Sequence, residues 1–248
     1  MSDDRTGAST GLPSYSYAFQ PIVDVAAGEV QSYEALIRGS GGESAQHVFA
    51  QVKPEHLYQL DRESRITAVA LAGRLGVSCH LNLNVLPRDV QRSSSELPAM
   101  IEMAERCGIQ ASRLILELTE GEAIDDHARF AQAIDTYRAL GVKVAIDDFG
   151  AGYSGLNLLA DFQPDMIKLD MNLVRGIESR GPRQSIARAI MTVCNDLGIE
   201  VVAEGVETLD EFVWFEEEGV RLFQGYLFAK PGFECLPLPQ YPVPHRAI

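Results

Sequence analysis

Apolar residues along the chain change their spacing repeatedly, between the alternation of a strand and the three-to-four-residue repeat of an amphipathic helix. Alternating segments that predict strands occupy residues 17–23, 30–38, 79–85, 113–119, 142–148, 165–170, 199–205 and part of 221–230. Segments with helical character stand between them at 44–52, 54–75, 94–108, 125–141, from about 154, at 181–198 and from 208. This succession predicts parallel strands joined by crossover helices.

The first two strands depart from that rule. A short turn at Ala27 and Gly28 separates them, which predicts an antiparallel hairpin. Seven or eight strand–helix units then predict an α/β fold, a (β/α)8 barrel of the TIM type with one reversed strand. We expect a flexible segment at 1–14 and a single domain at 15–248. Its Pro-rich tail, 234–248, is expected either to be disordered or to pack across the barrel base.

Two of the later helices carry specific signals. The segment 181–198 has Pro near its first turn, Gly after its last, and an apolar stripe at helical spacing made of Ile186, Ile190, Val193 and Leu197. Thr208 and Glu211 predict a capping box at the start of the helix that follows.

The composition narrows the class of partner. The 248 residues include 35 acids against 21 Lys and Arg, a formal charge of −14, which argues against broad binding of nucleic-acid polymers or anionic membranes. No apolar run reaches about 18 residues, so we expect no membrane insertion. Residues 1–14 lack the apolar core of a signal peptide. The four cysteines are widely separated, as in a reduced, cytoplasmic protein.

The segment 142–156, VKVAIDDFGAGYSGL, ends a strand in two adjacent acids, Asp147 and Asp148. Gly150 and Gly152 interrupt the strand immediately afterwards, so a turn can present both carboxylates to one cavity. Two anions this close repel each other unless a cation lies between them. Taken alone, such a pair is more often a solvated acidic loop.

Other predicted strands end in the same kind of residue, and in a parallel barrel these ends converge on one mouth. The polar residues at the strand ends are Glu34, Asn82 or Asn84, Glu117, Glu120, Asp147, Asp148, Lys168, Asp170, Glu204, Glu207 and Gln224. So many anions buried together require divalent cations, and oxygen ligands without His or Cys suit Mg²⁺ or Mn²⁺.

A carboxylate that bridges two metal ions is a common device for hydrolysing phosphate esters, and Asp147 is the natural bridge. The five His residues show no clustering with an acid and a Ser, so a catalytic triad is not expected. The sequence also lacks a glycine-rich phosphate fingerprint. The residues therefore indicate a metal-dependent hydrolase or lyase without naming its substrate.

Several spaced motifs together resemble the EAL-domain cyclic di-GMP phosphodiesterases. They are EALIR (34–38), the Asn of NVLPR (84–88), ELTE (117–120), DDFGAGYSGL (147–156), KLD (168–170), AEGVET (203–208) and QGYLFAKP (224–231). The resemblance covers roughly residues 17–233. In addition, GGESAQHVFAQV (41–52) resembles the subgroup of EAL domains often attached to blue-light sensor domains.

The resemblance implies a set of metal ligands in this chain: Glu34, Asn84, Glu117, Asp147 and Asp148, with Glu204 completing the set or acting as the base. Asn84 is preferred to Asn82 because Pro87 and Arg88 after it keep the family's spacing. Two Mg²⁺ or Mn²⁺ ions per site are implied, and Ca²⁺ is expected to inhibit.

The resemblance also implies roles around the metals. Lys168, Asp170 and Glu207 would join Glu204 in the catalytic group, and Glu120 would anchor the loop after DDFG. The implied substrate contacts are Gln20, Leu36, Arg38, Gln224 and Pro231. The planar fork of Arg38 suits a phosphate oxygen.

The implied reaction is hydrolysis of cyclic di-GMP, a bacterial second messenger, to linear pGpG by in-line attack of a metal-bound water. Whether Glu204 or Lys168 handles the proton stays open. A homodimer through the region after Asp148 is expected.

Three alternatives remain. The first is a catalytically silent receptor or interaction module. The second is an aldolase that uses Lys168 as a Schiff base. In the third, the acids merely solubilise the barrel mouth.

Overall fold

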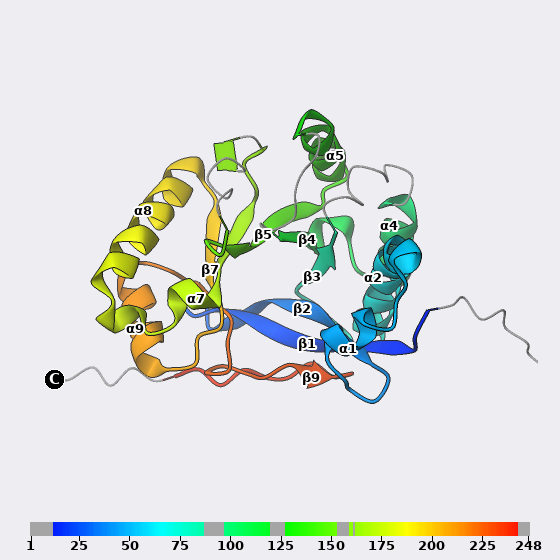
Figure 1. Ribbon diagram of the computed structural model, residues 1–248, viewed down its shortest axis with the longest axis horizontal. Helices are drawn as coiled ribbons and strands as arrows, with labels where there is room; N and C mark the ends of the chain where they lie inside the picture. The colour runs from blue at the N-terminus through cyan, green and yellow to red at the C-terminus, as the bar shows by residue number, and fades with distance from the viewer. Residues whose placement is uncertain (1–11, 87–96, 120–126, 153–158, 161, 243–248) are drawn as a thin grey trace, which may run out of the picture.

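The computed structural model (Figure 1) describes residues 12–86, 97–119, 127–152, 159–160 and 162–242. Within these ranges the strands form one sheet in the order β2-β3-β4-β5-β6-β7-β8-β1-β9, and β1 also pairs with β2, so the sheet closes. Neighbouring strands from β2 to β8 are parallel, whereas β1 is antiparallel to both β2 and β8. The prediction of an eight-stranded barrel with one reversed strand is confirmed.

The strands of the described chain are β1 (Tyr15–Asp24), β2 (Glu29–Gly39), β3 (His80–Val85), β4 (Leu114–Thr119), β5 (Lys143–Phe149), β6 (Met166–Leu169), β7 (Glu200–Ala203), β8 (Leu222–Phe223) and β9 (Gly232–Phe233). The α-helices are α1 (Ala45–Phe49), α2 (Leu57–Arg74), α4 (Leu97–Arg106), α5 (His127–Ala139), α7 (Met171–Val174), α8 (Gly181–Leu197) and α9 (Leu209–Glu217). Short 3-10 turns lie at Pro54–His56, Ala111–Arg113 and Ile177–Ser179.

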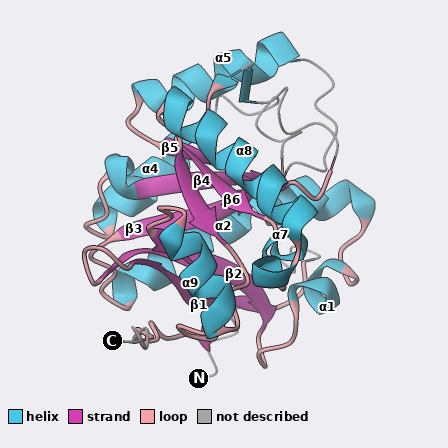
Figure 2. Ribbon diagram, turned by 90° about the vertical axis from the view of Figure 1, so that its left-hand side faces the viewer, coloured by secondary structure: helices cyan, strands magenta, loops and turns pink. Residues whose placement is uncertain are grey.

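The helices lie outside the strands, with α8 and α9 on the left of Figure 1 and α2 and α4 on the right. Figure 2 shows the same arrangement from the side. Each predicted strand has a counterpart, although β8 is only two residues long, and β9 was not predicted. The helix expected from about Ser154 lies mostly outside the described residues.

The predicted capping box of α9 is confirmed. The Thr208 hydroxyl accepts a hydrogen bond from the Glu211 amide at 3.2 Å, and the Glu211 carboxylate accepts one from the Thr208 amide at 3.1 Å. The two bonds satisfy donors that the first turn of a helix leaves unpaired. The cap residue, Thr208, stands four residues after Glu204.

The apolar stripe predicted for α8 does not form the buried face. Ile186, Val193 and Leu197 are 54%, 38% and 39% exposed. The buried residues of α8 are Ala187, Ile190 and Cys194. The helix therefore packs through a face rotated away from the large aliphatic side chains, because the small residues at 187 and 194 let it approach the sheet closely. Only Ile190 belongs to both stripes.

Inside the barrel, an apolar layer underlies a polar one. A separate buried cluster consists of Ile22, Ile115, Ala145, Met166, Val202 and Leu222. Two residues further toward the same mouth, the strands carry Gln20, Glu117, Asp147, Lys168, Glu204 and Gln224. Since side chains two apart on a strand face the same side, the apolar residues close the barrel and the polar residues line its mouth.

The start of the C-terminal tail packs on the barrel. β9 pairs with β1 at Phe233 opposite Ala18. The Tyr33 hydroxyl donates to the Pro237 carbonyl at 3.0 Å, and the Gln240 amide donates to the Phe228 carbonyl at 2.9 Å. For the described part, these contacts favour packing over disorder.

Gly225, directly after the inward-facing Gln224, packs against backbone. A Cβ atom placed there would overlap the backbone of Val206. We expect Gly225→Ala to lower the free energy of unfolding by about 1–3 kcal/mol, because backbone cannot move aside as a flexible side chain can. Gly181→Ala is the matched control, since a Cβ there meets nothing within 4 Å. Urea unfolding measures both, and equal midpoints would contradict the packing argument.

Candidate active site

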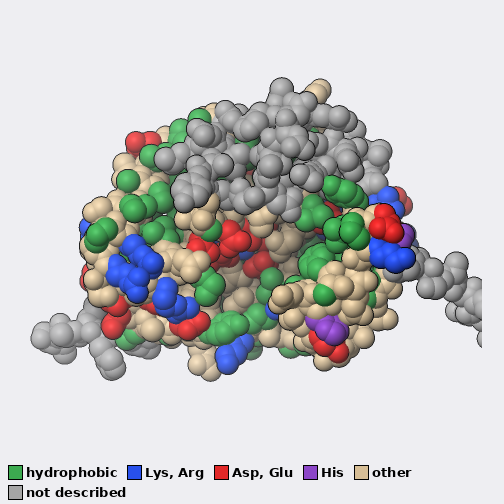
Figure 3. Space-filling view, in the orientation of Figure 1, with side chains coloured by type: hydrophobic (Ala, Val, Ile, Leu, Met, Phe, Trp, Pro, Cys, Tyr) green, Lys and Arg blue, Asp and Glu red, His purple; other side chains and the backbone are tan. Residues whose placement is uncertain are grey.

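The polar layer gathers at the carboxyl ends of the parallel strands. Figure 3 shows Asp and Glu side chains deep in a hollow near the centre of this face. Glu34, Glu117 and Lys168 come from β2, β4 and β6, and each is at most 6% exposed. The barrel thus brings ionisable groups that are distant in sequence into one recess, as we predicted from the polar residues at the strand ends.

The Lys168 ammonium lies at the centre of this group. Its Nζ is 2.6 Å from Glu204, 2.9 Å from Glu117, 3.1 Å from Asp147 and 3.2 Å from Glu34. Lys168 itself is 1% exposed. A buried charge is stable only when it is paired and hydrogen-bonded, and here one cation serves four anions.

The electrostatics follow from this imbalance. Burial opposes the charge of Lys168, but the four surrounding carboxylates hold its pKa well above the ordinary value. Burial raises the pKa of Glu117 well above its usual range, and the charge of Glu34 adds to the effect. Burial likewise raises the pKa of Glu204, and there the nearby Lys168 only partly offsets it.

Glu34 behaves differently. Burial again opposes its ionisation, but Lys168 and hydrogen bonds from Gln224 and Asn84 together hold its pKa below the ordinary value. Gln224 donates to one Glu34 oxygen at 2.7 Å, and Asn84 donates to the other at 3.1 Å. Glu34 is therefore the carboxylate of the group that the protein itself best stabilises as an anion.

Two sets of carboxylates have the spacing of cation sites. One consists of Glu34, Glu117 and Asp147, and the other of Asp147, Asp148 and Glu204; in each, one ligand atom per residue lies within 4.8 Å of the others. Asp147 belongs to both. Glu117 Oε2 is also buried and accepts no hydrogen bond among the described residues. An excess of anions with uncommitted oxygens fits divalent cations.

The backbone explains how two consecutive acids serve one cavity. The pairing of β5 with β6 is irregular between Ile146 and Phe149, and Asp148 has a φ of 54°. A bulge of this kind redirects a side chain that would otherwise point outward. Partial burial and the negative charges of Asp147 and Asp170 raise the pKa of Asp148 to about 6, although the residue is open to the cleft.

The two asparagines of β3 both project into the site, at different depths. Asn84 is exposed at the rim and donates to Glu34. Asn82 is fully buried and donates to Glu117 Oε1 at 2.7 Å. The sequence had offered either residue as the strand-end amide, and the barrel uses both.

Two cavities of about 390 and 220 Å³ meet at Glu34 and Asp148. The larger is also lined by Leu36, Arg38 and Asn84. The lining of the smaller includes Gln20, Glu204, Glu207 and Gln224. Most predicted substrate and catalytic residues therefore border one two-lobed cleft.

The remaining predicted residues are Pro231, Asp170 and Glu120. Pro231 lines neither lobe. Asp170 caps α7, where its carboxylate accepts hydrogen bonds from the amide and side chain of Asn172, both at 2.9 Å. Glu120 lies outside the described residues.

Glu207 is held by residues that the motifs did not single out. Its carboxylate is 2.8 Å from the Arg175 guanidinium. The buried Glu211 accepts hydrogen bonds from the amides of Gly176, Glu207 and Thr208 at 2.9–3.1 Å. The capping box signalled Glu211 as a helix cap only; nothing local in the sequence signals the bond to Gly176, which joins two loops of the mouth.

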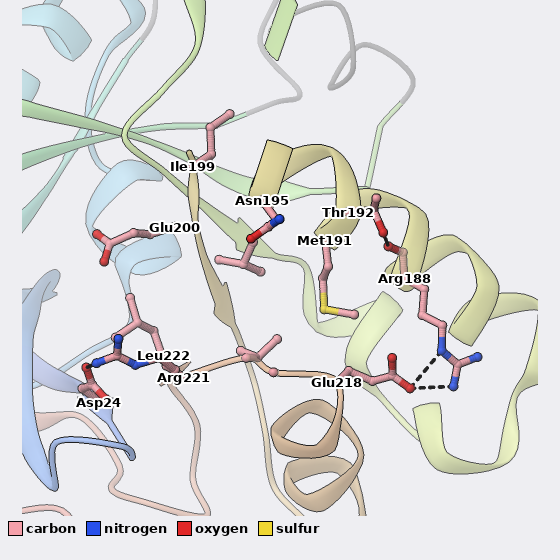
Figure 4. Close-up of a pocket in the computed structure, with 13 residues that line it drawn as sticks. Asp24, Arg188, Met191, Thr192, Asn195, Ile199, Glu200, Glu218, Arg221 and Leu222 are labelled. Atoms are coloured by element: carbon pink, nitrogen blue, oxygen red, sulfur yellow. Dashed lines mark hydrogen bonds and ion pairs between the residues drawn. The ribbon is translucent and has the colours of Figure 1, made fainter. Parts of the chain in front are cut away.

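A cavity of about 590 Å³ lies at the opposite end of the barrel, where β7 begins at Glu200. Figure 4 shows the Arg188–Glu218 and Arg221–Asp24 ion pairs on its two sides. Among the described lining residues, Asp24 and Glu218 are paired with arginines, which leaves Glu200 alone rather than a group of uncommitted anions. The group of uncommitted carboxylates, rather than the cavity volume, identifies the mouth that holds Lys168 as the candidate site.

A (β/α)8 barrel with a carboxylate cluster at its C-terminal mouth defines a class of barrel enzymes that use divalent cations. Comparison with known families is more specific. Residues 13–231 match the EAL domain, and the chain belongs to that family. The resemblance seen in the motifs is confirmed.

Similar proteins are known by sequence. The blue light- and temperature-regulated antirepressor BluF of Escherichia coli K12 is 34% identical over 227 residues, which cover 91% of this chain and 56% of BluF. Cyclic di-GMP phosphodiesterase PA2567 of Pseudomonas aeruginosa is 32% identical over 230 residues, covering 88% of this chain and 38% of that protein. The chain thus spans about half, or less, of these relatives.

Solved structures are similar as well. A standalone versatile EAL protein from Vibrio cholerae O395, in its c-di-GMP-bound form, has a TM-score of 0.88 and 42% identity, covering 92% of this chain and 96% of that one. Klebsiella pneumoniae BlrP1 in a manganese and cyclic di-GMP complex has a TM-score of 0.85 and 42% identity, covering 92% and 58%. In the described part of the chain, every helix is too short or too polar to span a bilayer.

The central role of Lys168 can be tested by Lys168→Met. Without the ammonium, four carboxylates lose their shared partner, so we expect the metal-free protein to lose about 3–5 kcal/mol of unfolding free energy. Lys53→Met, on an exposed residue, is the control and should have little effect. Urea unfolding in chelator gives both values, and similar losses for the two variants would refute the role.

Proposed function

We propose that this chain hydrolyses cyclic di-GMP to linear pGpG with two divalent cations. The observation that carries the proposal is the double carboxylate cluster around Asp147. Its setting at the C-terminal mouth of an EAL-family barrel, and relatives that bear the name cyclic di-GMP phosphodiesterase, support the same substrate.

We assign Glu34, Asn84, Glu117 and Asp147 to one cation, and Asp147, Asp148 and Glu204 to the other. Asn84 donates its amide N–H to Glu34, which leaves its carbonyl oxygen for the metal. When bound, the cations supply a water of lowered pKa and neutralise the phosphodiester oxygens. The all-oxygen donor set suits Mg²⁺ or Mn²⁺, and we expect Ca²⁺ to bind without supporting turnover.

The residues then divide the proton chemistry. Lys168 has four anionic neighbours and stays charged, so it can donate a hydrogen bond to the attacking water or to phosphate but cannot accept a proton. Glu204, which is 2.6 Å from Lys168 and lines the smaller lobe, is the acceptor we assign. Glu207, fixed by Arg175, borders the same lobe.

The substrate occupies the two-lobed cleft in this proposal. Arg38 lines the larger lobe with Leu36, and its planar fork can donate two hydrogen bonds to a phosphate oxygen pair. Gln20 and Gln224 line the smaller lobe. Pro231 lies seven residues after Gln224, and we retain it as a substrate contact outside these two lobes.

The retained charge of Lys168 weighs against the aldolase alternative, because Schiff-base formation needs a neutral amine. The silent-receptor alternative uses the same cleft. It is disfavoured because every acid of the two cation clusters is present.

We further propose a homodimer through the region after Asp148, with Glu120 anchoring that loop. Residues 120 and 153–158 lie outside the described residues. The cysteines are free thiols, which is consistent with the reducing cytoplasm we propose as the location.

Activity can be tested with purified protein, Mn²⁺ and cyclic di-GMP. We expect release of pGpG, and a loss of more than about 100-fold in turnover for Glu34→Gln and Asp147→Asn, since even outer-shell residues cost 10–100-fold. Glu200→Gln, an acid at the other end of the barrel, should leave turnover unchanged. Cyclic di-GMP binding without product at high protein concentration supports the receptor instead.

The cations can be tested without substrate. Saturating Mn²⁺ should raise the thermal midpoint, because a ligand at 100 times its Kd adds about 2.7 kcal/mol to the folded state. EDTA should reverse the shift, and Asp147→Asn should abolish it. An unchanged midpoint in the parent protein would show that the acids only solubilise the mouth.

A further inference from the structure

Asn82 carries the most deeply buried side-chain amide of the site, and it is not one of the proposed metal ligands. It is 0% exposed and lies on β3 two residues before Asn84, so both side chains face the barrel interior. In the sheet it is paired with Glu34 on β2 and Ile115 on β4. Its amide is therefore set beneath the carboxylates rather than at the rim.

Two donors reach the same oxygen of Glu117. Asn82 Nδ2 donates to Glu117 Oε1 at 2.7 Å, and Lys168 Nζ lies 2.9 Å from that oxygen. Glu117 Oε2 is buried and accepts no hydrogen bond among the described residues. The two donors approach from different strands, so they restrict the rotation of the carboxylate about its terminal torsion, which is otherwise broad.

The orientation of the Asn82 amide is also determined. An ionised carboxylate can only accept, so the nitrogen of the amide faces Glu117 when Glu117 is a charged metal ligand. Leu at this position would remove the donor and keep the same branching and number of heavy atoms, although its methyl groups are larger than the amide. Ser would keep a hydroxyl but shorten the side chain, so its oxygen would fall short of Glu117.

We infer that Asn82 is a positioning residue that, together with Lys168, turns Glu117 so that Oε2 is the oxygen presented to the cation between Glu34, Glu117 and Asp147. The inference rests on the proposed function, because it requires that cation. Lys168 alone cannot do this, because it is shared among four carboxylates. The side-chain amide of Asn82 donates to Glu117 alone among the described residues.

The test is calorimetric titration of chelator-treated protein with Mn²⁺ in the absence of cyclic di-GMP. Asn82→Leu should weaken Mn²⁺ binding by about 10–100-fold, the usual effect of losing an outer-shell partner. Asn82→Ser should weaken it similarly. Ser32→Ala is the matched control, because Ser32 is also 0% exposed inside the barrel and its hydroxyl bonds to no carboxylate; it should bind like the parent protein.

The outcomes distinguish failure of the positioning role from failure of the proposed metal chemistry. Parent protein that binds no Mn²⁺ overturns the proposed metal chemistry itself. Parent protein that binds Mn²⁺, with both Asn82 variants within about twofold of Ser32→Ala, overturns the positioning role. Thermal unfolding of each metal-free variant is measured alongside. If Asn82→Leu proves unfolded, the better-tolerated Asn82→Ser decides by the same criterion.

Discussion

The buried charge of Lys168 is the constraint on which the rest of the site depends. One ammonium lies within 3.2 Å of Glu34, Glu117, Asp147 and Glu204, which the closed barrel brings together from separate strands. A buried ion group of this kind contributes little stability in itself, but removing one partner is costly. The net excess of anions is the feature that fits the mouth to the divalent cations we propose.

The barrel supports this charge cluster with an apolar layer directly beneath it. Ile115 lies two residues before Glu117, and Met166 two residues before Lys168. Along the same inward face, the side chains thus change from apolar to ionisable while the strand register stays the same. Because water cannot enter from below, electrostatic interactions in the mouth are stronger than they would be at an open surface. The same exclusion explains the raised pKa values of Glu117 and Glu204.

Hydrogen bonds from neutral amides hold both oxygens of Glu34 and one oxygen of Glu117, which leaves Glu117 Oε2 for a ligand. Asn84 and Gln224 engage Glu34, and Asn82 engages Glu117. The loops are held in a similar way, since Glu211 accepts three backbone amides beside Glu207. Preorganisation of this kind lowers the reorganisation needed when a charged ligand binds.

Sequence alone determined the strand–helix succession, the reversed first strand, the acids at the strand ends and the family, because periodicity and motif spacing are local properties. Tertiary structure decided what depends on register and closure. It separated Asn82 from Asn84 by depth, turned α8 onto Ala187 and Cys194 instead of its aliphatic stripe, and joined Arg175 to Glu207. None of these follows from spacing, because each depends on which strand or loop lies opposite once the barrel has closed.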